Sequence, residues 1–377
     1  MKILIAPDKM KYSLPAPEVA EYIRKGIVKV FPDAEFIITP LADGGEGTAR
    51  ALTTATGGHL VAVPVHDALQ REIKAYYGIT SDGETAIIEI AAASGIEHLK
   101  PEERNPLLTT SYGSGELIKA ALDSGCKKFI IGLGGSATND GGAGLTQALG
   151  AKLLDAAGKE ISYGGGSLDN LHTIDITGMD VRLKNCSYTV ACDVKNPLTG
   201  NNGASYVFGP QKGATAEMIV QLDSNLKHYA KVIKKSLGKD VEELPGAGAA
   251  GGLGAGLKAF LNAELTPGFE IVAELTGLEE QIKKADIVVT AEGKTDSSTL
   301  SGKVPYGVAQ LAKKHQKPVL LFTGTIGNGS DKLYDAGITS IIPIVNKPMA
   351  LEEAIPNTPQ LLSEAAERTF LIIKAFL

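Results

Sequence analysis

Short apolar segments, each followed by a loop with glycine or polar residues, recur at both ends of the chain. They are four to five residues long, which suits the strands of a parallel sheet and is too short for helices. Segments with apolar residues at helical spacing lie between them. The expected strands are residues 3–6, 36–39, 287–290, 319–323 and 340–344, and the expected helices are residues 15–31, 305–315 and 358–375. This alternation predicts a parallel sheet covered by helices.

The middle of the chain differs from its ends. Residues 60–65, 73–77 and 86–90 are expected strands joined by short polar connections, which favours an antiparallel or mixed sheet. Residues 188–192 and 205–208 are further strand candidates. We therefore predict an α/β protein in which a flavodoxin-like or Rossmann-like parallel-sheet domain is interrupted by an inserted, mixed α/β domain. The first domain is expected to comprise residues 1–60, 106–150 and 265–377, and the inserted domain residues 61–105 and 151–264.

Composition excludes several classes of protein. The 377 residues include 37 Lys plus Arg against 43 Asp plus Glu, a net charge of −6, so the basic surplus of a nucleic-acid binder is missing. No apolar stretch approaches the ~20 residues of a membrane helix, and the N-terminus lacks the pattern of a signal peptide. Three cysteines without C-x-x-C spacing and six scattered histidines argue against a disulfide framework and against zinc. We expect a cytoplasmic protein that binds neither nucleic acid nor a membrane.

Glycine is frequent, with 44 of 377 residues against an average usage of about 7%. Residues 132–144, GLGGSATNDGGAG, follow an expected strand and open a helix. Backbone N–H groups in such a loop can bind phosphate, aided by the helix N-terminus. Gly132, Gly134 and Ala137 also fit the G-x-G-x-x-A pattern of dinucleotide-binding folds, with Asp155 as the ribose-binding acid. The fit is poor where polar residues and further glycines occupy the helix start.

A second glycine-rich segment, residues 245–256, matches the same pattern at Gly246, Gly248 and Gly251 but has no strand before it. It predicts either close helix packing through small residues or anion binding. The chain contains no G-x-x-x-x-G-K-[ST] motif, so ATP binding here would not be of the Walker A type.

Acidic residues follow the expected parallel strands, namely Asp8, Asp43 with Glu46, Asp193, and Glu292 with Asp296. Ligands of open α/β sheets bind beyond the carboxyl ends of the strands. Each acid could instead cap a helix or form an Asx-turn, but four strand ends of the same character favour a ligand site. Lysines occur in nearby loops, at Lys9, Lys11, Lys195, Lys212, Lys294 and Lys303. Carboxylates, cations and glycine loops are what phosphoryl transfer requires, so the residues predict an α/β enzyme that handles a phosphorylated ligand.

Seven long segments carry a family likeness, and they include IAPDKMKYSLPAPEVA, PLADGGEGTARAL and GLGGSATNDGGAGLTQALGA. The others are residues 105–118, 191–214, 245–257 and 288–315. With these segments in order, the chain resembles the bacterial type 1 glycerate kinases along nearly its whole length. The resemblance implies phosphorylation of D-glycerate with ATP and Mg²⁺, with 2-phosphoglycerate favoured over 3-phosphoglycerate as the product. It also implies a flavodoxin-like domain interrupted by a second α/β domain, with the active site in the cleft between them.

Strand-end position and motif membership together suggest a role for each candidate residue. We expect Asp43 and Asp193 to be catalytic, one as the base for the glycerate hydroxyl and the other as a Mg²⁺ ligand, without deciding which is which. Glu292 and Asp296 are the further candidates for metal or nucleotide binding. The expected substrate-binding residues are Asp8, Lys9, Lys11, Arg104 and Lys195, and the expected phosphate-binding residues are Gly134, Gly135, Ser136, Thr138, Asn139 and Lys303.

Two other functions compete with the kinase. A nicotinamide-dependent oxidoreductase of a small hydroxy acid would use the loop that begins at Gly132, although no well-placed His or Tyr offers acid–base chemistry. A non-catalytic nucleotide or metabolite sensor would keep the loops but would have no need for a base. The sequence also leaves open whether the chain forms a homo-oligomer.

Overall fold

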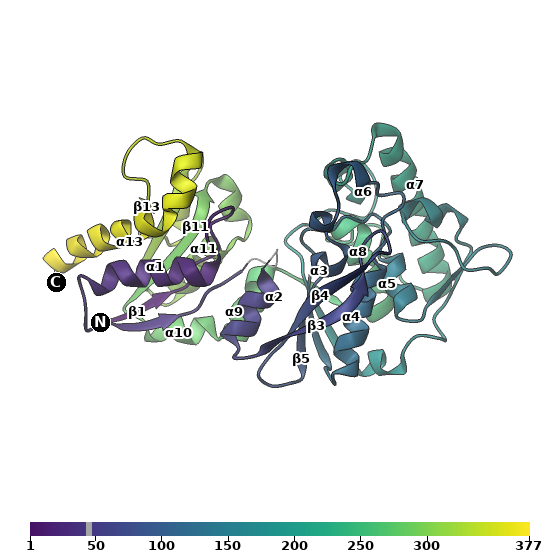
Figure 1. Ribbon diagram of the computed structural model, residues 1–377, viewed down its shortest axis with the longest axis horizontal. Helices are drawn as coiled ribbons and strands as arrows, with labels where there is room; N and C mark the ends of the chain where they lie inside the picture. Colours follow the sequence, from purple (N-terminus) through teal and green to yellow (C-terminus); the bar gives the residue numbers. More distant parts are fainter. Residues whose placement is uncertain (43–46) are drawn as a thin grey trace. The chain divides into compact units, whose positions relative to one another are not determined.

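The computed structural model of the protein describes residues 1–42 and 47–377 and contains two compact units (Figure 1). The first unit combines the two ends of the chain, residues Met1–Asp43 and Phe269–Leu377, and the second comprises Gly44–Gly268. A domain made from both ends and interrupted by an inserted one was predicted, and the structure confirms it.

The sheet of the first unit is entirely parallel, with the order β13-β12-β11-β1-β2. Its strands are β1 (Lys2–Ile5), β2 (Glu35–Ile38), β11 (Ile287–Thr295), β12 (Val319–Ile326) and β13 (Ser340–Pro343). Counted within this unit the order is 2-1-3-4-5, the doubly wound order in which the chain reverses direction across the sheet between the first and third strands. The reversal therefore lies between β1 and β11, which are paired neighbours.

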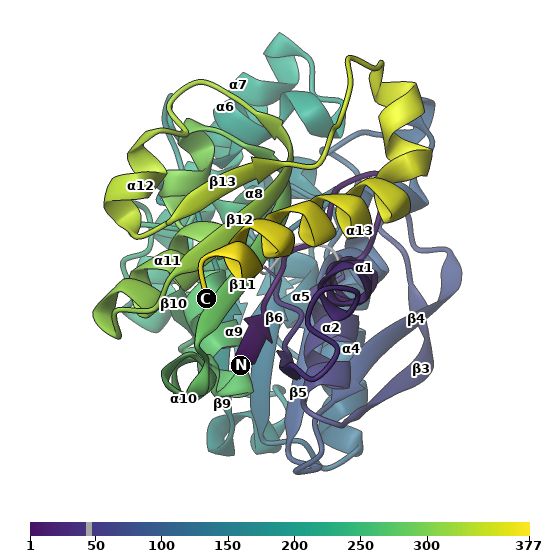
Figure 2. The ribbon, with the colours of Figure 1, turned by 90° about the vertical axis from the view of Figure 1, so that its left-hand side faces the viewer.

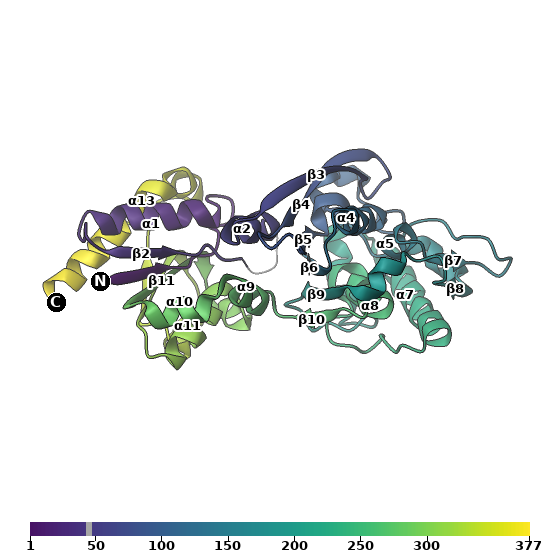
Figure 3. The same ribbon diagram turned by 90° about the horizontal axis from the view of Figure 1, so that it is seen from below.

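Helices cover both faces of this sheet, with α1 and α13 on one side and α10 and α11 on the other (Figures 2 and 3). The helices are α1 (Ala16–Val28), α9 (Gly268–Thr276), α10 (Leu278–Lys284), α11 (Val304–Lys314), α12 (Lys332–Ala336) and α13 (Leu351–Ala375). Helix α1 approaches α13 closely because Gly26 has no side chain, and a Cβ there would overlap the carbonyl oxygen of Ser363. Ile23, Ile27 and Phe370 join the buried core between the two helices and the sheet.

The second unit contains a mixed sheet with the order β10-β9-β6-β5-β4-β3. Its strands are β3 (His59–His66), β4 (Glu72–Ile79), β5 (Thr85–Glu89), β6 (Lys128–Gly132), β9 (Ser187–Ala191) and β10 (Glu264–Thr266). Strands β5, β6, β9 and β10 are parallel, and β3 and β4 form an antiparallel hairpin at one edge. This mixed sheet confirms the predicted difference between the middle and the ends of the chain. A separate antiparallel pair consists of β7 (Lys152–Leu154) and β8 (Thr173–Asp175).

The two largest buried apolar clusters among the described residues of the second unit both receive side chains from the glycine-rich helix α8. Leu253 and Leu257 pack into the cluster against the mixed sheet, whereas Ala255 and Ala259 pack into a cluster built around α7. The helices of this unit are α2 (Thr48–Ala55), α3 (Ala91–Ser94), α4 (Tyr112–Asp123), α5 (Ala143–Ala148), α6 (Ala204–Phe208), α7 (Ala216–Leu237) and α8 (Ala249–Leu261). Residues 205–208 were expected to form a strand and lie in α6 instead, so that prediction was wrong.

The boundaries of the units also differ from the predicted ones. Residues 106–150 were assigned to the first domain, but β6 within them is hydrogen-bonded between β5 and β9 in the sheet of the second unit. Residues 47–60 likewise belong to the second unit, where β3 begins at His59. The prediction failed because a parallel strand with a following glycine loop suits either sheet equally well.

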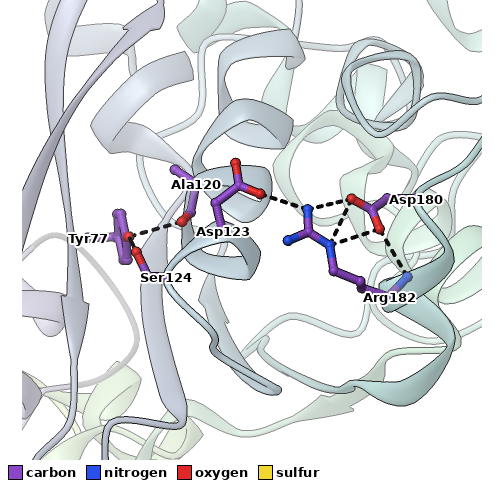
Figure 4. A network of polar contacts seen from close by, with 6 residues as sticks. All are labelled: Tyr77, Ala120, Asp123, Ser124, Asp180 and Arg182. Carbon is purple, nitrogen blue, oxygen red and sulfur yellow. Dashed lines mark hydrogen bonds and ion pairs between the residues drawn. The ribbon is translucent and has the colours of Figure 1, made fainter.

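A polar network ties α4 to the rest of the second unit at the amino ends of the parallel strands (Figure 4). The Arg182 guanidinium donates to Asp123 at the end of α4 over 2.7 Å and to Asp180 over 2.6 Å. Hydrogen bonds from the side chain and the backbone N–H of Arg182 lower the pKa of Asp180 to about 2. In addition, Tyr77 on β4 pairs with Ser124 over 2.7 Å. These contacts lie opposite the loops described next and serve the fold.

Candidate active site

After β1 ends, the chain continues to run beside β11, and this extended segment positions Asp8. The backbone N–H groups of Ala6 and Asp8 donate to the carbonyl oxygens of Val289 and Ala291 over 2.7 and 2.9 Å. Asp8 is buried, and its Oδ1 accepts the N–H of Lys9 over 2.7 Å. Asp8 therefore lies at the carboxyl ends of β1 and β11, where the strand order reverses and where doubly wound sheets bind their ligands.

Glu292 lies within β11 and not after it, which corrects the predicted end of this strand at residue 290. The strand continues because β12 remains paired with it as far as Thr295. Glu292 is buried and accepts the hydroxyl of Thr299 over 2.8 Å. Burial raises the pKa of this carboxyl group, and the bond from Thr299 opposes that shift in part. A raised pKa of a buried carboxyl group is common at functional sites.

Asp296 follows β11 and caps the 3₁₀ segment Ser297–Ser301. It accepts the Ser298 N–H over 2.9 Å and pairs with the Lys294 ammonium over 2.9 Å. The bonds from Ser298 and Lys294 hold the pKa of the Asp296 carboxyl far below its ordinary value. Lys303 reaches the same segment, donating to the Ser298 hydroxyl over 2.9 Å. Asp296 therefore has the capping role that the sequence left open, and it also lies directly after the end of β11.

In the second unit, the loop from Leu133 to Gly142 follows β6, and the buried Asp140 organises it. The Asp140 carboxylate accepts the N–H groups of Ser111, Gly142 and Gly144 over 2.8, 3.1 and 3.2 Å, and the Ser111 hydroxyl over 2.9 Å. Hydrogen bonds to an ionised acceptor are the stronger ones. Asp140 therefore fixes the loop from within and is itself fully buried.

The predicted phosphate-binding residues of this loop fall into two groups. Gly134 and Gly135 are exposed, whereas Ser136, Thr138 and Asn139 are buried. The Asn139 amide donates to Ser205 on α6 over 2.9 Å. Thr138 Oγ1 and Asn139 Oδ1 find no hydrogen-bond partner among the residues that the structure describes. The exposed part of the loop is accordingly at its start.

Lys212 lies under this loop and was noted in the sequence only as one of several lysines. It is 1% exposed, and its ammonium donates to Ser136 Oγ over 2.9 Å and to the Thr138 carbonyl over 2.7 Å. Burial lowers the pKa of Lys212 from 10.5 to about 7, while Asp140 acts in the opposite direction. The sequence shows that Lys212 lies in a turn-rich segment, GPQKGA, which could have marked it as a candidate. It does not show that the side chain is buried.

Arg104 adjoins Lys212 through Gly213, whose left-handed backbone (φ +89°) packs against the Arg104 carbonyl. Its Nε is buried without a hydrogen-bond partner in the described part of the chain. Such a donor is costly unless a ligand or water accepts from it. Arg104 and Lys212 therefore bring two cationic side chains to one region of the second unit.

Asp193 follows β9 and is exposed, as is Lys195 beyond it. Asp193 Oδ1 accepts the N–H of Gly268 over 2.9 Å, at the first residue of α9. This bond lies within the second unit, of which Gly268 is the last residue. Asp43, the other predicted catalytic acid, lies outside the described residues.

The glycine-rich helix α8 packs directly against the loop after β6. The Gly141 N–H donates to the Gly251 carbonyl over 3.0 Å, and Gly251 has φ +71°. A Cβ at Gly251 would overlap the Thr138 carbonyl oxygen, and one at Gly256 would overlap that of Gly141. The sequence left open whether this segment packs closely or binds an anion, and the structure shows close packing.

The context required for a dinucleotide fingerprint does not form. Strand β6 ends at Gly132, but α5 begins only at Ala143, so the helix N-terminus does not follow the glycines directly. Asp155 lies in a turn after β7, where it accepts the N–H groups of Ala157 and Lys159. Strand β7 pairs with β8 and not with β6.

The candidate residues thus form one group in each unit, both at the carboxyl ends of parallel strands. Glu292 and Asp296 belong to the first group, and Arg104, Asp193 and the loop after β6 to the second. No cluster of three or more His, Cys, Asp or Glu that could hold a metal occurs among residues 1–42 and 47–377. Within the same residues, no helix is both long and apolar enough to cross a membrane. Fold and site together define a two-domain α/β protein with charged, glycine-rich loops at the strand ends of each unit.

Comparison with known proteins makes this class specific. Residues 3–374 match the model of the glycerate kinase family. The chain is 55% identical to the glycerate 2-kinase of Escherichia coli K12 over 354 residues, which cover 94% of this chain and 93% of the relative. It is 48% identical to the glycerate kinase of Bacillus subtilis 168, covering 99% and 98% of the two chains. The chain therefore belongs to the glycerate kinase family, and it is a kinase.

A solved structure supports the same assignment at the level of the fold. The crystal structure of a candidate glycerate kinase 2 from Salmonella typhimurium LT2 is similar with a TM-score of 0.91 and 49% sequence identity. The match covers 100% of this chain and 98% of the other. The two-unit α/β architecture is thus shared with that structure.

Proposed function

We propose that the protein transfers the γ-phosphoryl group of ATP to D-glycerate and that 2-phosphoglycerate is the product. The observation that carries this proposal is the 55% identity to a glycerate 2-kinase over 94% of the chain. The charged and glycine-rich loops at the strand ends of both units agree with it, because phosphoryl transfer depends on positioning and on neutralising charge.

The loop after β6 is the proposed site for phosphate oxygens. Gly134 and Gly135 are exposed residues whose backbone N–H groups are the proposed donors, and the Lys212 ammonium donates to the hydroxyl of Ser136. A phosphate on this loop would place negative charge near the Lys212 ammonium and so favour its charged form. Thr138 and Asn139 are buried and support the loop, and Lys303 is proposed as a further cation for the nucleotide.

The glycerate carboxylate requires a fixed cation. Arg104 is the strongest candidate because its buried Nε lacks a partner among the described residues. Lys9 and Lys11 after β1 and Lys195 after β9 are the alternative cations, and Asp8 is proposed to accept a glycerate hydroxyl.

The carboxylates within β11 and directly after it fit Mg²⁺. Mg²⁺ is usually held by one or two carboxylates together with substrate phosphates, and Glu292 and Asp296 supply hard oxygen ligands of that kind. The depressed pKa of Asp296 keeps it ionised at neutral pH. When bound, the ion neutralises charge on the transferring phosphate.

The base for the glycerate hydroxyl is proposed to be Asp193 or Asp43, the other being a metal ligand. Asp193 is exposed and already accepts one N–H through Oδ1. A positioned carboxylate can take the hydroxyl proton as the bond to phosphorus forms.

The test is release of ADP from ATP and Mg²⁺ that depends on D-glycerate, with phosphorus NMR of the product. D-Lactate, which has only the 2-hydroxyl, and 3-hydroxypropionate, which has only the 3-hydroxyl, serve as matched acceptors. We expect 2-phosphoglycerate and a weak reaction with D-lactate only. No ADP release with D-glycerate would refute the proposed activity, whereas 3-phosphoglycerate would refute only the position of transfer.

A further inference from the structure

A cavity of about 270 Å³ lies within the first unit at the carboxyl ends of its parallel strands. Met10 and Lys11 after β1 line it together with Gly293 of β11. These two strands are the pair between which the strand order reverses. The cavity therefore coincides with the place where sheets of this order bind ligands, and all its lining residues belong to the first unit.

The walls of this cavity are mainly apolar. Ile344 and Val345 after β13 and Met349 before α13 form one side, and Leu351 and Ile355 of α13 form another. Unbranched methionine side chains adapt readily to the shape of a ligand. Among the described lining residues, Lys11 carries the only charge, and its ammonium lies over the Tyr12 ring, 5.1 Å from the centroid.

Two glycines on neighbouring strands give the cavity a wall without side chains. Gly293 of β11 and Gly324 of β12 both line it. A Cβ added at Gly324 would lie only 2.7 Å from the Gly293 carbonyl oxygen. A Cβ added at Gly293 would lie 3.3 Å from the backbone nitrogen of Lys11. Such a strip of bare backbone suits a flat ring that also needs hydrogen-bond partners at its edge.

A hydrogen bond from the loop after β1 to α13 holds the wall formed by α13 in place, and it uses a carbonyl oxygen that a proline leaves without its helical partner. Pro359 lies inside the helix and has no N–H to give to the carbonyl of Ile355, four residues earlier. The Ser13 hydroxyl donates to that carbonyl over 3.0 Å instead. Ser13 and Ile355 both line the cavity, so this bond joins the loop after β1 to α13 beside it.

These properties select the ligand. A phosphate chain carries several negative charges, and Lys11 is the only cation among the described lining residues, so most of those charges would lie against these walls without a partner, which is unfavourable. A purine base buries two apolar faces and needs only a few polar partners at its edge. The volume suits a base and not a whole nucleotide, since pockets for drug-sized ligands measure about 300–1,000 Å³.

We propose that this cavity binds the purine base of the nucleotide substrate. Gly293 of the cavity wall stands between Glu292 and Lys294 in β11, so a nucleotide with its base here begins beside the proposed metal ligands. The inference rests on the proposed function in that it takes ATP to be the phosphoryl donor.

The test fills the cavity from α13. Ala354 lines the cavity, and Ala354→Leu adds bulk without loss of helix propensity. Ala375→Leu is the matched control, since Ala375 lies in the same helix and is exposed. Binding of ATP and of inorganic tripolyphosphate is measured by calorimetry, with thermal unfolding as the check on folding.

We expect Ala354→Leu to weaken ATP binding about tenfold, to leave tripolyphosphate binding unchanged, and to reduce the preference for ATP over CTP. Ala375→Leu should behave as the unmodified protein. Unchanged ATP binding, or equal loss for ATP and tripolyphosphate, would overturn the inference.

Leu351→Ser is the second variant, in case Ala354→Leu does not fold. Leu351 is 64% exposed and lines the cavity, so the change removes apolar wall with little effect on the core. A threefold loss of ATP affinity is expected, and no loss would count against the base-binding role. If ADP release with D-glycerate is normal while both variants bind ATP normally, the cavity assignment alone is wrong. If the unmodified protein releases no ADP with D-glycerate, the proposed function itself is wrong.

Discussion

The Lys212 amine is buried and donates to two neutral oxygens, Ser136 Oγ and the Thr138 carbonyl. Its titration makes the stability of the protein sensitive to pH. Its pKa is lowered to about 7 in the folded chain, against 10.5 when solvated. Between these values the unfolded chain carries the proton and the folded chain does not. The unfolded state therefore binds more protons, so the free energy of unfolding rises with pH in this window.

Lys212→Met removes that dependence. Between pH 7.5 and 9 we expect the unfolding free energy of the unmodified protein to rise relative to the variant by about 1.4 kcal/mol per pH unit, the value for one proton. Urea unfolding at three pH values measures it, with Lys195→Met as control because Lys195 is exposed. Parallel pH profiles for all three proteins would show that Lys212 keeps an ordinary pKa.

Asp193→Asn tests the proposed chemistry at the residue scale. An amide cannot take a proton and is a poor metal ligand, so kcat should fall by roughly two or more orders of magnitude. The Gly268 N–H can still donate to the amide oxygen, so the melting temperature should change little. Steady-state kinetics with D-glycerate give the answer, and turnover near that of the unmodified protein would remove Asp193 from the catalytic residues.

At the scale of elements, the contact between α8 and the loop after β6 depends on glycines that admit no side chain. Gly251 and Gly238 have nearly the same backbone, with φ +71° and +70°. A Cβ at Gly251 would overlap the Thr138 carbonyl, whereas a Cβ at Gly238 meets nothing within 4 Å. The pair therefore separates the cost of a left-handed backbone from the cost of close packing.

Gly238→Ala should lower the unfolding free energy by about 1 kcal/mol, the cost of a left-handed alanine. Gly251→Ala should cost several kcal/mol because the helix and the loop must move apart. The same variant should also weaken tripolyphosphate binding, since Thr138 lies in the loop. Urea unfolding of the two variants checks this, and equal losses would mean that the contact is loose.

Sequence patterns predicted where most helices and strands lie, but not which elements pair or pack with one another. The strand near residue 287 was expected to end at residue 290, yet it continues through Glu292 because β12 runs beside it. Residues 205–208 are rich in β-forming side chains but form α6, which packs against α7 and α8. Acids at strand ends could be found from spacing alone, whereas the burial of Lys212 depends on the folded chain around it.

At the scale of the molecule, the second unit has the features of an independent domain. Its sheet is completed by strands from residues 59–266, and two large apolar clusters lie within the unit. We expect a fragment of residues 47–267 to unfold cooperatively on heating, because no strand of its sheet is left out. Circular dichroism during a thermal scan tests this, and a gradual change without a transition would contradict it.

The pairing of β1 with β11 also has a consequence for synthesis. Ile3 pairs with Ile287, near the other end of the chain, and translation takes on the order of tens of seconds to cover that separation. During this time β1, α1 and β2 can associate, but one edge of β1 has no neighbour. Meanwhile the inserted unit is already complete. The nascent chain thus carries a finished domain beside an unfinished one, and an open strand edge of this kind invites pairing with other chains.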